Sequence, residues 1–412
     1  MKKSILLLAP LFFFLFCSCQ EKKEAVFNTT IKEIPSPCKE GGVPNLFISE
    51  NGTTYLSWVE YLNDTTDALV FSKLKNEKWS SPHTIATGSD WFVNWADFPS
   101  LVAYEDGGKS LAAHWLQTSA KGSYDYDVRV AQSMDGGRTW SKSFIPHRDG
   151  IPAEHGFVSM LPLSDNNIFA TWLDGRNTKG EENEADAHGH GQGGAMTLRG
   201  AIFDKKGTLT QEVELDNRTC DCCQTSVALT DKGLIVAYRD RSEKEIRDIY
   251  IVRQVGEEWT SPQPIFNDDW KISGCPVNGP VIVAEDKNVA IAWFSAPEKK
   301  ARVKIAFSKD SGANFSLPIR VDDGKPLGRV DIVMLSPNEA LVSWLEEADE
   351  GAVIKAVRVN PKGKIGESFN IANSNAARQS GFPRMEKNKN QIIFAWTNAD
   401  SISRVKTAVL DL

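Results

Sequence analysis

The chain lacks an excess of positive charge, since 47 lysines and arginines stand against 54 aspartates and glutamates, for a formal net charge of −7. No basic stripe is present to neutralise phosphates, and this excludes nucleic acid as a partner. The chain also lacks a linker that would divide it into domains. Its N-terminal apolar run, residues 5–16, is too short to span a membrane.

The first twenty residues nevertheless predict export. Lys2 and Lys3 precede the apolar run, and the sequence FCSC follows it. Ser18 before Cys19 resembles a bacterial lipoprotein processing site, which implies residues 1–19 as signal and lipidation site, and 20–26 as a polar tether. Acyl chains on Cys19 would hold the protein on the outer membrane or cell surface without crossing it. A cleaved secretory peptide is the alternative.

A repeat is the main signal in the rest of the chain. Seven short apolar strands end on or beside an aromatic residue: Trp58, Trp115, Trp172, Tyr238, Trp293, Trp344 and Trp396. The successive spacings are 57, 57, 66, 55, 51 and 52 residues. A period of this size indicates stacked units that cannot bury their faces alone. We therefore expect an all-β fold, a seven-bladed β-propeller of four-stranded blades.

The two ends of the chain predict closure of this ring. The segment after the seventh aromatic, RVKTAVL, leaves the last blade short of strands, and FNTTIKEI at 27–34 supplies the missing one. Pairing the first strand with the last blade removes two sheet edges that would otherwise invite aggregation. Residues 27–412 are therefore predicted to form a single domain.

Two motifs carry a family resemblance. SMDGGRTW at 133–140 and SKDSGANF at 308–315 resemble the Asp box of sialidase-like, or BNR-repeat, propellers. The resemblance implies structural turns between outer strands, far from the ligand mouth. Each turn is expected to use an aspartate that binds backbone amides, a glycine in a tight conformation and an aromatic between sheets. The motif residues are Ser133, Asp135, Gly137, Trp140, Ser308, Asp310, Gly312 and Phe315.

The resemblance does not extend to a sialidase active site. Sialidases have six blades and three arginines that hold a carboxylate, the first in a Phe-Arg-Ile-Pro segment. The nearest segment here, residues 96–99, is ADFP without arginine. Tyr238, which could pass for the nucleophilic tyrosine, matches the register of the six tryptophans and is interpreted as a packing residue. Function has to be argued from the site.

The loops that enter each inner strand and leave each second strand open on one face of a propeller, around the central channel. Side chains of both charges gather in these loops. Catalytic candidates are Asp97, His155 and Asp240, because a glycosidase needs an acid with a base or nucleophile and a lyase needs a base. Arginine forks suit carboxylate or sulfate groups. Substrate-binding candidates are Asn94, Asp174, Arg176, Arg239, Arg241, Arg247, Asn278, Arg329 and Arg378.

Cysteines form a second signal. Cys220, Cys222 and Cys223 open the fourth repeat, and Cys275 opens the fifth at an equivalent position. One interpretation is a disulfide between the two loops, as export favours. The other is a thiolate site for copper or zinc with His155 nearby. Cys38 has no evident partner. A 66-residue spacing marks an insertion after Trp172 that carries His188 and His190 and is predicted to be a loop.

Two functions remain open at this point. The first is an enzyme that acts on an anionic glycan, as a glycosidase or lyase, through the central mouth of the ring. The second is a non-catalytic propeller that binds glycan, protein or metal through the same mouth. Neither the substrate nor the oligomeric state can be deduced from the sequence.

Overall fold

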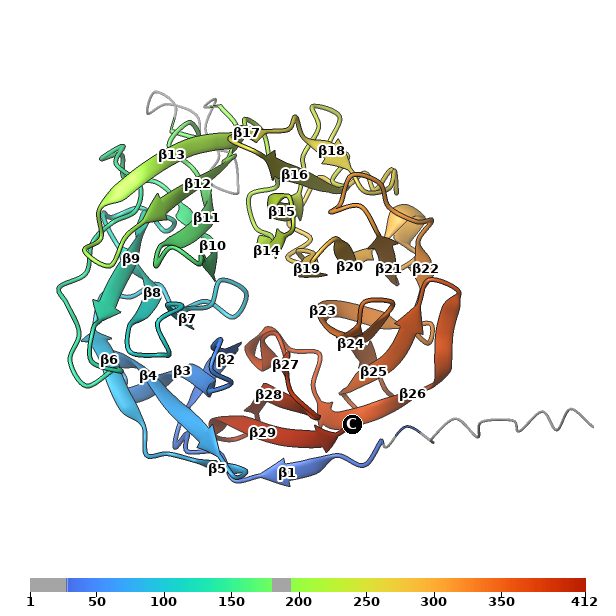
Figure 1. Cartoon of the computed structure of the whole chain (residues 1–412), viewed down its shortest axis with the longest axis horizontal. Coiled ribbons are helices and arrows are strands. Elements are labelled where there is room, and N and C mark those ends of the chain that lie inside the picture. Colours follow the sequence, from blue (N-terminus) through green and yellow to red (C-terminus); the bar gives the residue numbers. More distant parts are fainter. Residues whose placement is uncertain (1–26, 28, 180–193) are drawn as a thin grey trace, which may run out of the picture.

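A computed structural model describes residues 27, 29–179 and 194–412. Seven β-sheets surround a central axis as the blades of a propeller (Figure 1). The predicted seven-bladed fold is confirmed. The lipidation site at Cys19 and the histidines His188 and His190 lie outside the described residues and remain predictions. No helix in the described ranges combines the length and the apolar character that crossing a membrane requires.

The strands of each blade follow the chain from the axis outward. Blade 1 contains β2 (Gly41–Ile48), β3 (Thr54–Asn63), β4 (Thr66–Lys75), β5 (Lys78–Trp79) and β6 (His83–Gly88). Blade 2 contains β7 (Ser100–Ala103), β8 (Leu111–Thr118) and β9 (Tyr126–Ser133), with a bridge between Val130 and Phe144 at its outer edge. Blade 3 contains β10 (His155–Pro162), β11 (Ile168–Asp174), β12 (Thr197–Phe203) and β13 (Leu209–Asp216).

The second half of the ring repeats this order. Blade 4 contains β14 (Ser226–Thr230), β15 (Gly233–Arg239), β16 (Ile249–Val255), β17 (Glu258–Trp259) and β18 (Gln263–Pro264). Blade 5 contains β19 (Val281–Glu285), β20 (Asn288–Ser295), β21 (Arg302–Ser308) and β22 (Ile319–Arg320). Blade 6 contains β23 (Pro326–Ser336), β24 (Glu339–Glu347), β25 (Ala352–Asn360) and β26 (Gly363–Ser374). Blade 7 contains β27 (Arg384–Asn388), β28 (Gln391–Ala399), β29 (Ser403–Asp411) and β1 (Lys32–Ile34). The short 3-10 helices η1 (Pro297–Lys299) and η2 (Arg378–Ser380) lie in connecting loops.

The N-terminal strand closes the ring, as predicted from the short last repeat. Strand β1 runs antiparallel to β29, with Lys32 opposite Val409 and Ile34 opposite Thr407. Ile34 is buried, and its carbonyl accepts a hydrogen bond of 3.0 Å from the Thr407 hydroxyl. This pairing covers the outer edge of β29 and gives β1 a partner, so a long edge strand is replaced by a short one at the rim of blade 7.

The repeated aromatic residues fill the spaces between neighbouring blades. Trp58, Trp172, Trp293, Trp344 and Tyr238 are among the largest side chains that are fully buried. Each lies on the second strand of its blade, and Trp58, Tyr238, Trp293 and Trp344 pack into apolar clusters that two sheets share. Burial of these rings explains the period of the sequence, because every blade needs a large apolar side chain at the same position to pack against the neighbouring blade.

The two Asp-box segments form turns that follow the third strand of blades 2 and 5. Asp135 accepts hydrogen bonds of 3.0 and 2.9 Å from the Arg138 and Thr139 amides. At Gly137, φ is 89° and a Cβ atom would lie 2.3 Å from the Phe71 ring, so glycine is required there. Trp140 packs edge-on against Phe71 at 6.2 Å. These turns lie at the end of the blades opposite the loops that enter the inner strands.

Candidate functional site

The segment 94–98, which enters blade 2, belongs to the blue-green loop beside β7 that reaches toward the centre of the ring (Figure 1). We call it the plug. Its Trp95 ring stacks on Phe382 of the loop that enters blade 7, with centroids 5.8 Å apart. Its Ala96 carbonyl accepts a 2.6 Å hydrogen bond from Gln224, which precedes blade 4. The plug thus contacts the loops that enter blades 4 and 7.

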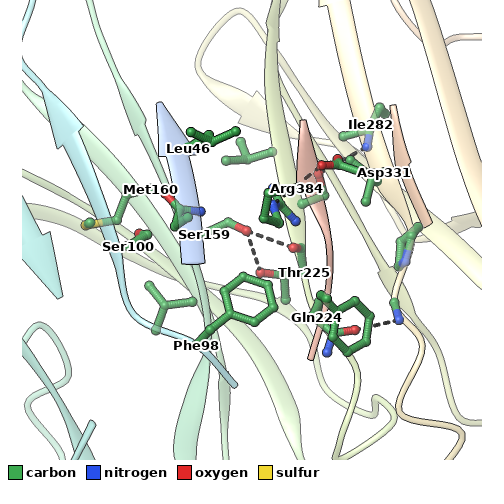
Figure 2. Close-up of a pocket in the computed structure, with 18 of the residues that line it drawn as sticks. Leu46, Phe98, Ser100, Ser159, Met160, Gln224, Thr225, Ile282, Asp331 and Arg384 are labelled. Atoms are coloured by element: carbon green, nitrogen blue, oxygen red, sulfur yellow. Dashed lines mark hydrogen bonds and ion pairs between the residues drawn. The ribbon is translucent and has the colours of Figure 1, made fainter. Parts of the chain in front are cut away.

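A cavity of about 230 Å³ lies beneath the plug and is lined by the innermost strands (Figure 2). Phe98 lines this cavity, together with the charged side chains Asp331, Arg384 and Glu386. Arg384 Nε lies 3.5 Å from Asp331 Oδ2. Burial raises the pKa of Glu386 to about 8, with Asp331 adding to the shift. The central channel is therefore polar inside, but the plug separates it from the loops above.

Two predicted site residues connect one blade to the next. The inner strands of blades 3 and 6 begin with a bulge in which Phe157 and Arg329 have φ values of 53° and 55°. Asp97 Oδ1 accepts the Phe157 amide at 2.7 Å, and Asn278 Oδ1 accepts the Arg329 amide at 2.7 Å. These hydrogen bonds hold strained backbone in place. Asp97 is 2% exposed, so its predicted catalytic role is wrong, and Asn278 has a structural role too.

Asp97→Asn is expected to change the pH dependence of stability. Burial raises the pKa of Asp97 to about 7, although bonds from Phe157 and Tyr126 favour its charged form. Its unfolded pKa is about 3.9, so wild-type stability falls as pH rises from about 4 to 7. The asparagine keeps the acceptor for Phe157 and cannot ionise.

Thermal unfolding between pH 4.5 and 8 measures this difference. The melting temperature of the variant relative to wild type should rise with pH, whereas exposed Asp64→Asn should show no trend. A difference that is constant across the range contradicts the assignment.

His155 lies in a buried network away from the mouth. Its Nε2 is 3.0 Å from Asp149 Oδ2 and 3.6 Å from Asp174 Oδ1, and its ring stacks on His147 at 3.7 Å. Burial lowers the pKa of His155, but hydrogen bonding to Asp149 and the charge of Asp174 outweigh it and raise the pKa. Arg176 completes the network with an ion pair of 2.7 Å to Asp174. With 0% exposure, His155 cannot reach a ligand, and its predicted catalytic role is wrong.

Three predicted substrate arginines are also buried, and one of them, Arg247, is 3% exposed and donates to Cys220 Sγ and Glu245. Arg239, 1% exposed, donates to the carbonyl oxygens of Asn278, Arg247 and Phe294 at 2.6 to 3.1 Å. Arg329, 6% exposed, donates to Ser380 and to three carbonyl oxygens of the loop at 376–381. Both fix loops from inside, so the prediction that they contact substrate is wrong.

Asp240 differs from its equivalents in other blades. In blades 1, 3 and 6 the carboxylate two residues after the tryptophan accepts the indole N–H: Trp58 to Glu60 at 2.6 Å, Trp172 to Asp174 at 2.9 Å and Trp344 to Glu346 at 2.5 Å. In blade 4 the aromatic is Tyr238, and its hydroxyl donates to Asp216 instead. Asp240 therefore lacks this bond and remains half-buried.

The electrostatic setting of Asp240 suits proton transfer. Burial raises the pKa of Asp240 to about 7, and the nearby charges of Asp216 and Asp248 add to the shift. A carboxyl that titrates near neutral pH can give or take a proton under physiological conditions. Of the three catalytic candidates, Asp240 alone combines accessibility with such a pKa.

Cysteines and charged groups from three loops meet beside Asp240. Arg247 Nη1 lies 3.2 Å from Cys220 Sγ, and Arg241 Nη1 lies 2.9 Å from Asp221 Oδ2. Cys275 interacts with Cys222 across the two loops. The Cys220–Cys223 segment, Cys275 and the Arg239–Arg241 loop therefore lie in one region, as the equivalent positions of these loops in neighbouring repeats predicted.

The described cysteines are all free thiols, so the predicted disulfide is not present. Cys220 Sγ lies 3.8 Å from Cys222 Sγ and 3.6 Å from Cys223 Sγ. These separations are far longer than a sulfur–sulfur bond of about 2.05 Å. Cys220, Cys222 and Cys223 are close enough together to hold a metal ion. Cys38 lies elsewhere, buried between blades 1 and 7.

Glu154, which the sequence analysis left without a role, lies beside this region. Glu154 is half-buried, and its carboxyl lies 2.9 Å from the Tyr126 hydroxyl. Burial raises the pKa of Glu154 well above its ordinary value, and the charges of Asp97, Asp221 and Cys275 act in the same direction. Successive side chains of an extended chain point to opposite sides, so only one of Glu154 and His155 could face the mouth. The sequence showed that Glu154 and His155 must point to opposite sides, but it did not show which of the two faces the mouth.

The remaining predicted residues divide between local turns and the open surface. Asn94 accepts the Ala96 amide at 2.9 Å and so stabilises the plug. Arg378 is exposed at the mouth, and its guanidinium lies 5.9 Å from the centre of the Trp95 ring. Arg378 shows no hydrogen bond or ion pair from its guanidinium to any described residue. Trp95, which the sequence analysis missed, is packed between Phe382 and the guanidinium groups of Arg329 and Arg378.

Comparison with known proteins gives the class of fold. No family model and no curated protein matches the chain. Among solved structures, an ulvan lyase of a polysaccharide lyase family aligns with a TM-score of 0.58 at 12% identity, over 94% of this chain and 96% of that chain. At these identities the likeness establishes a shared propeller fold.

Two further structures have the same fold. A protein of unknown function from Dyadobacter fermentans aligns with a TM-score of 0.53 at 14% identity, over 93% of this chain and 99% of that chain. The phage phi92 endosialidase aligns with a TM-score of 0.51 at 11% identity, over 94% of this chain and 70% of that chain.

Proposed function

We propose that this propeller acts on an anionic glycan at the surface above the plug, by hydrolysis or by lyase elimination, with Asp240 as the proton-transfer group. The observation that carries the proposal is the state of Asp240, a half-buried carboxyl that lacks the indole bond of its equivalents and titrates near pH 7. Structural neighbours that include an ulvan lyase and an endosialidase support a glycan as substrate. Export as a lipoprotein anchored through Cys19 would present the site at the cell surface.

Arg378 is proposed to bind the substrate. A guanidinium without a carboxylate partner suits a carboxylate or sulfate. Arg378 meets this condition, because it is exposed, and its contact with the Trp95 ring positions it at the mouth. Arg241, in contrast, is already paired with Asp221 and Glu245. An extended polyanionic chain would run from Arg378 over the plug toward Asp240.

Arg378→Met is expected to weaken binding of the anionic polysaccharide about 10–150-fold, because one charge-assisted contact is worth about 1.5–3 kcal/mol. The measurement uses soluble polysaccharides that carry uronate, sulfate or sialic acid, with neutral polysaccharides for comparison, and follows both binding and release of product. Arg138→Met is the matched control, since Arg138 is exposed in the Asp-box turn on the opposite face.

The outcome separates the two classes of function. Product release by the wild type with weaker binding by the Arg378 variant supports an enzyme that binds at this surface. Binding without turnover of any anionic polysaccharide leaves the non-catalytic module, and equal binding of neutral and anionic chains refutes anion recognition at Arg378.

A further inference from the structure

We infer that Cys220, Cys222 and Cys223 form a binding site for a thiophilic closed-shell cation, Zn²⁺ or Cu⁺, with Cys275 as a fourth sulfur at the rim. This site is separate from the proposed glycan function and stands on its own observations. We call these four residues the cysteine cluster. Its three core sulfurs lie within 4.8 Å of one another.

The spacing of the sulfur atoms fits a shared ion. A cation about 2.3 Å from each of two thiolates, at tetrahedral angles, places the sulfurs about 3.8 Å apart. Cys220 Sγ lies 3.8 Å from Cys222 Sγ and 3.6 Å from Cys223 Sγ. Bonded sulfurs would lie much closer together. Both distances are compatible with one shared ion, and they also equal the packing distance of two thiols in contact, so the metal titration below decides between the two.

Positively charged side chains lie beside the cluster. The Arg247 guanidinium donates to Cys220 Sγ at 3.2 Å, and charge-assisted donors of this kind stabilise an anionic sulfur. Arg239 lies near Cys223, and the Asn278 backbone amide bonds to the Cys223 sulfur. In the part of the chain that the structure describes, the hydrogen bonds of the Arg239 side chain go to carbonyl oxygens and none to a carboxylate. The cluster would thus supply negative charge next to a buried cation.

Burial and access also suit a bound ion. Cys220 and Cys223 are 0% and 1% exposed, which shields metal–sulfur bonds from water and oxidants. Cys222 is half-buried and Cys275 is exposed, so an ion can enter from the mouth. Soft sulfur ligands select Cu⁺ and Zn²⁺ over hard cations such as Ca²⁺ and Mg²⁺. Among the described histidines none completes the set, and His155 lies in its own network with Asp149.

Metal titration of the purified full chain tests the site. The protein is reduced under anaerobic conditions, given Zn²⁺ or Cu⁺ in separate samples, desalted and analysed for metal. We expect one tightly held ion per chain in the wild type and in Cys38→Ala, the described cysteine outside the cluster. Cys223→Ser should lose this ion, and Arg247→Met should bind it about 10–100-fold more weakly because a neighbour that orients a ligand is lost.

Further measurements keep the test decisive. If Cys223→Ser fails to fold by circular dichroism, Cys222→Ser, at a half-buried position, takes its place. If the intact mass of the isolated protein shows a disulfide, metal binding after reduction still supports the site. The inference is overturned if the reduced wild type retains neither cation, or if the cysteine variants retain as much metal as the wild type. Because metal content is the readout, the result does not depend on glycan turnover.

Discussion

Asp240→Asn is expected to lower kcat on the anionic glycan by about 10²–10⁴-fold, the usual contribution of a general acid or base. The amide matches the carboxyl in size and cannot exchange a proton. Folding should survive, because Asp240 lacks the indole bond that holds the equivalent carboxylates of blades 1, 3 and 6. The measurement is steady-state kinetics on the polysaccharide that the wild type cleaves.

The pH profile of the wild type tells which role Asp240 plays. Its pKa is raised to about 7 by burial and by the neighbouring carboxylates Asp216 and Asp248, and Cys220 adds to the shift. An acid must be protonated, so activity would fall above about pH 7 in a hydrolase of this type. A base must be ionised, so activity would fall below about pH 7 in a lyase. In either case this limb of the profile should vanish in the variant.

Glu60→Gln is the control at the equivalent position of blade 1. Glu60 accepts the Trp58 indole N–H at 2.6 Å and the Lys39 amide at 3.2 Å, so its loss should reduce stability and leave kcat near the wild-type value. Wild-type kcat in the Asp240 variant, or an equal loss in both variants, would refute the catalytic assignment.

Arg239→Met is expected to lower the free energy of unfolding by about 3–5 kcal/mol, the range for breaking a buried charged network. The methionine fills similar volume but leaves the carbonyl oxygens of Asn278, Arg247 and Phe294 without donors. It also removes a guanidinium that lies 4.8 Å from the Trp270 ring centre. Three loops of the mouth therefore lose their shared anchor.

Chemical denaturation measures this loss. Arg148→Met, at an exposed position, should change stability by less than about 0.5 kcal/mol. The Arg239 variant should also show increased amide exchange in the loops around 247 and 278, because their carbonyl oxygens are released. Wild-type stability in this variant would mean that the carbonyl oxygens find other donors, and would contradict the anchoring role.

The fold was predictable because its signal is local and repeated. Each blade buries one aromatic at the end of its second strand, so Trp58 and Trp344 occupy equivalent positions nearly three hundred residues apart in a sequence of 412. Burial imposes the same requirement on every unit, and the requirement appears as a period. Ring closure followed from the count of strands, since the seventh repeat ended early. The meeting of the cysteine loops followed from the equivalence of their positions.

The roles of the mouth side chains were only partly predictable. Asp97 and Asp240 were equal candidates in the sequence, yet one binds the Phe157 amide in the next blade and the other lacks the bond its equivalents make. One signal was present, an acid two residues after the aromatic, with Tyr238 in place of tryptophan. The role of that acid depends on the partner of the Tyr238 hydroxyl, which is Asp216 and not Asp240.

The sequence by itself determined the seven blades, their closure by β1 and the face on which the charged loops gather. These features follow from the alternation and period of apolar residues, which burial dictates along the chain. Only the tertiary structure decided that residues 94–98 lie at the centre of the ring and that Arg239 and Arg329 hold loops through backbone carbonyl oxygens. It also decided that three sulfurs lie close enough together to share a metal ion. The partners of a polar side chain come from loops far away in the sequence, and nothing in the local pattern specifies which of them lies within hydrogen-bonding distance.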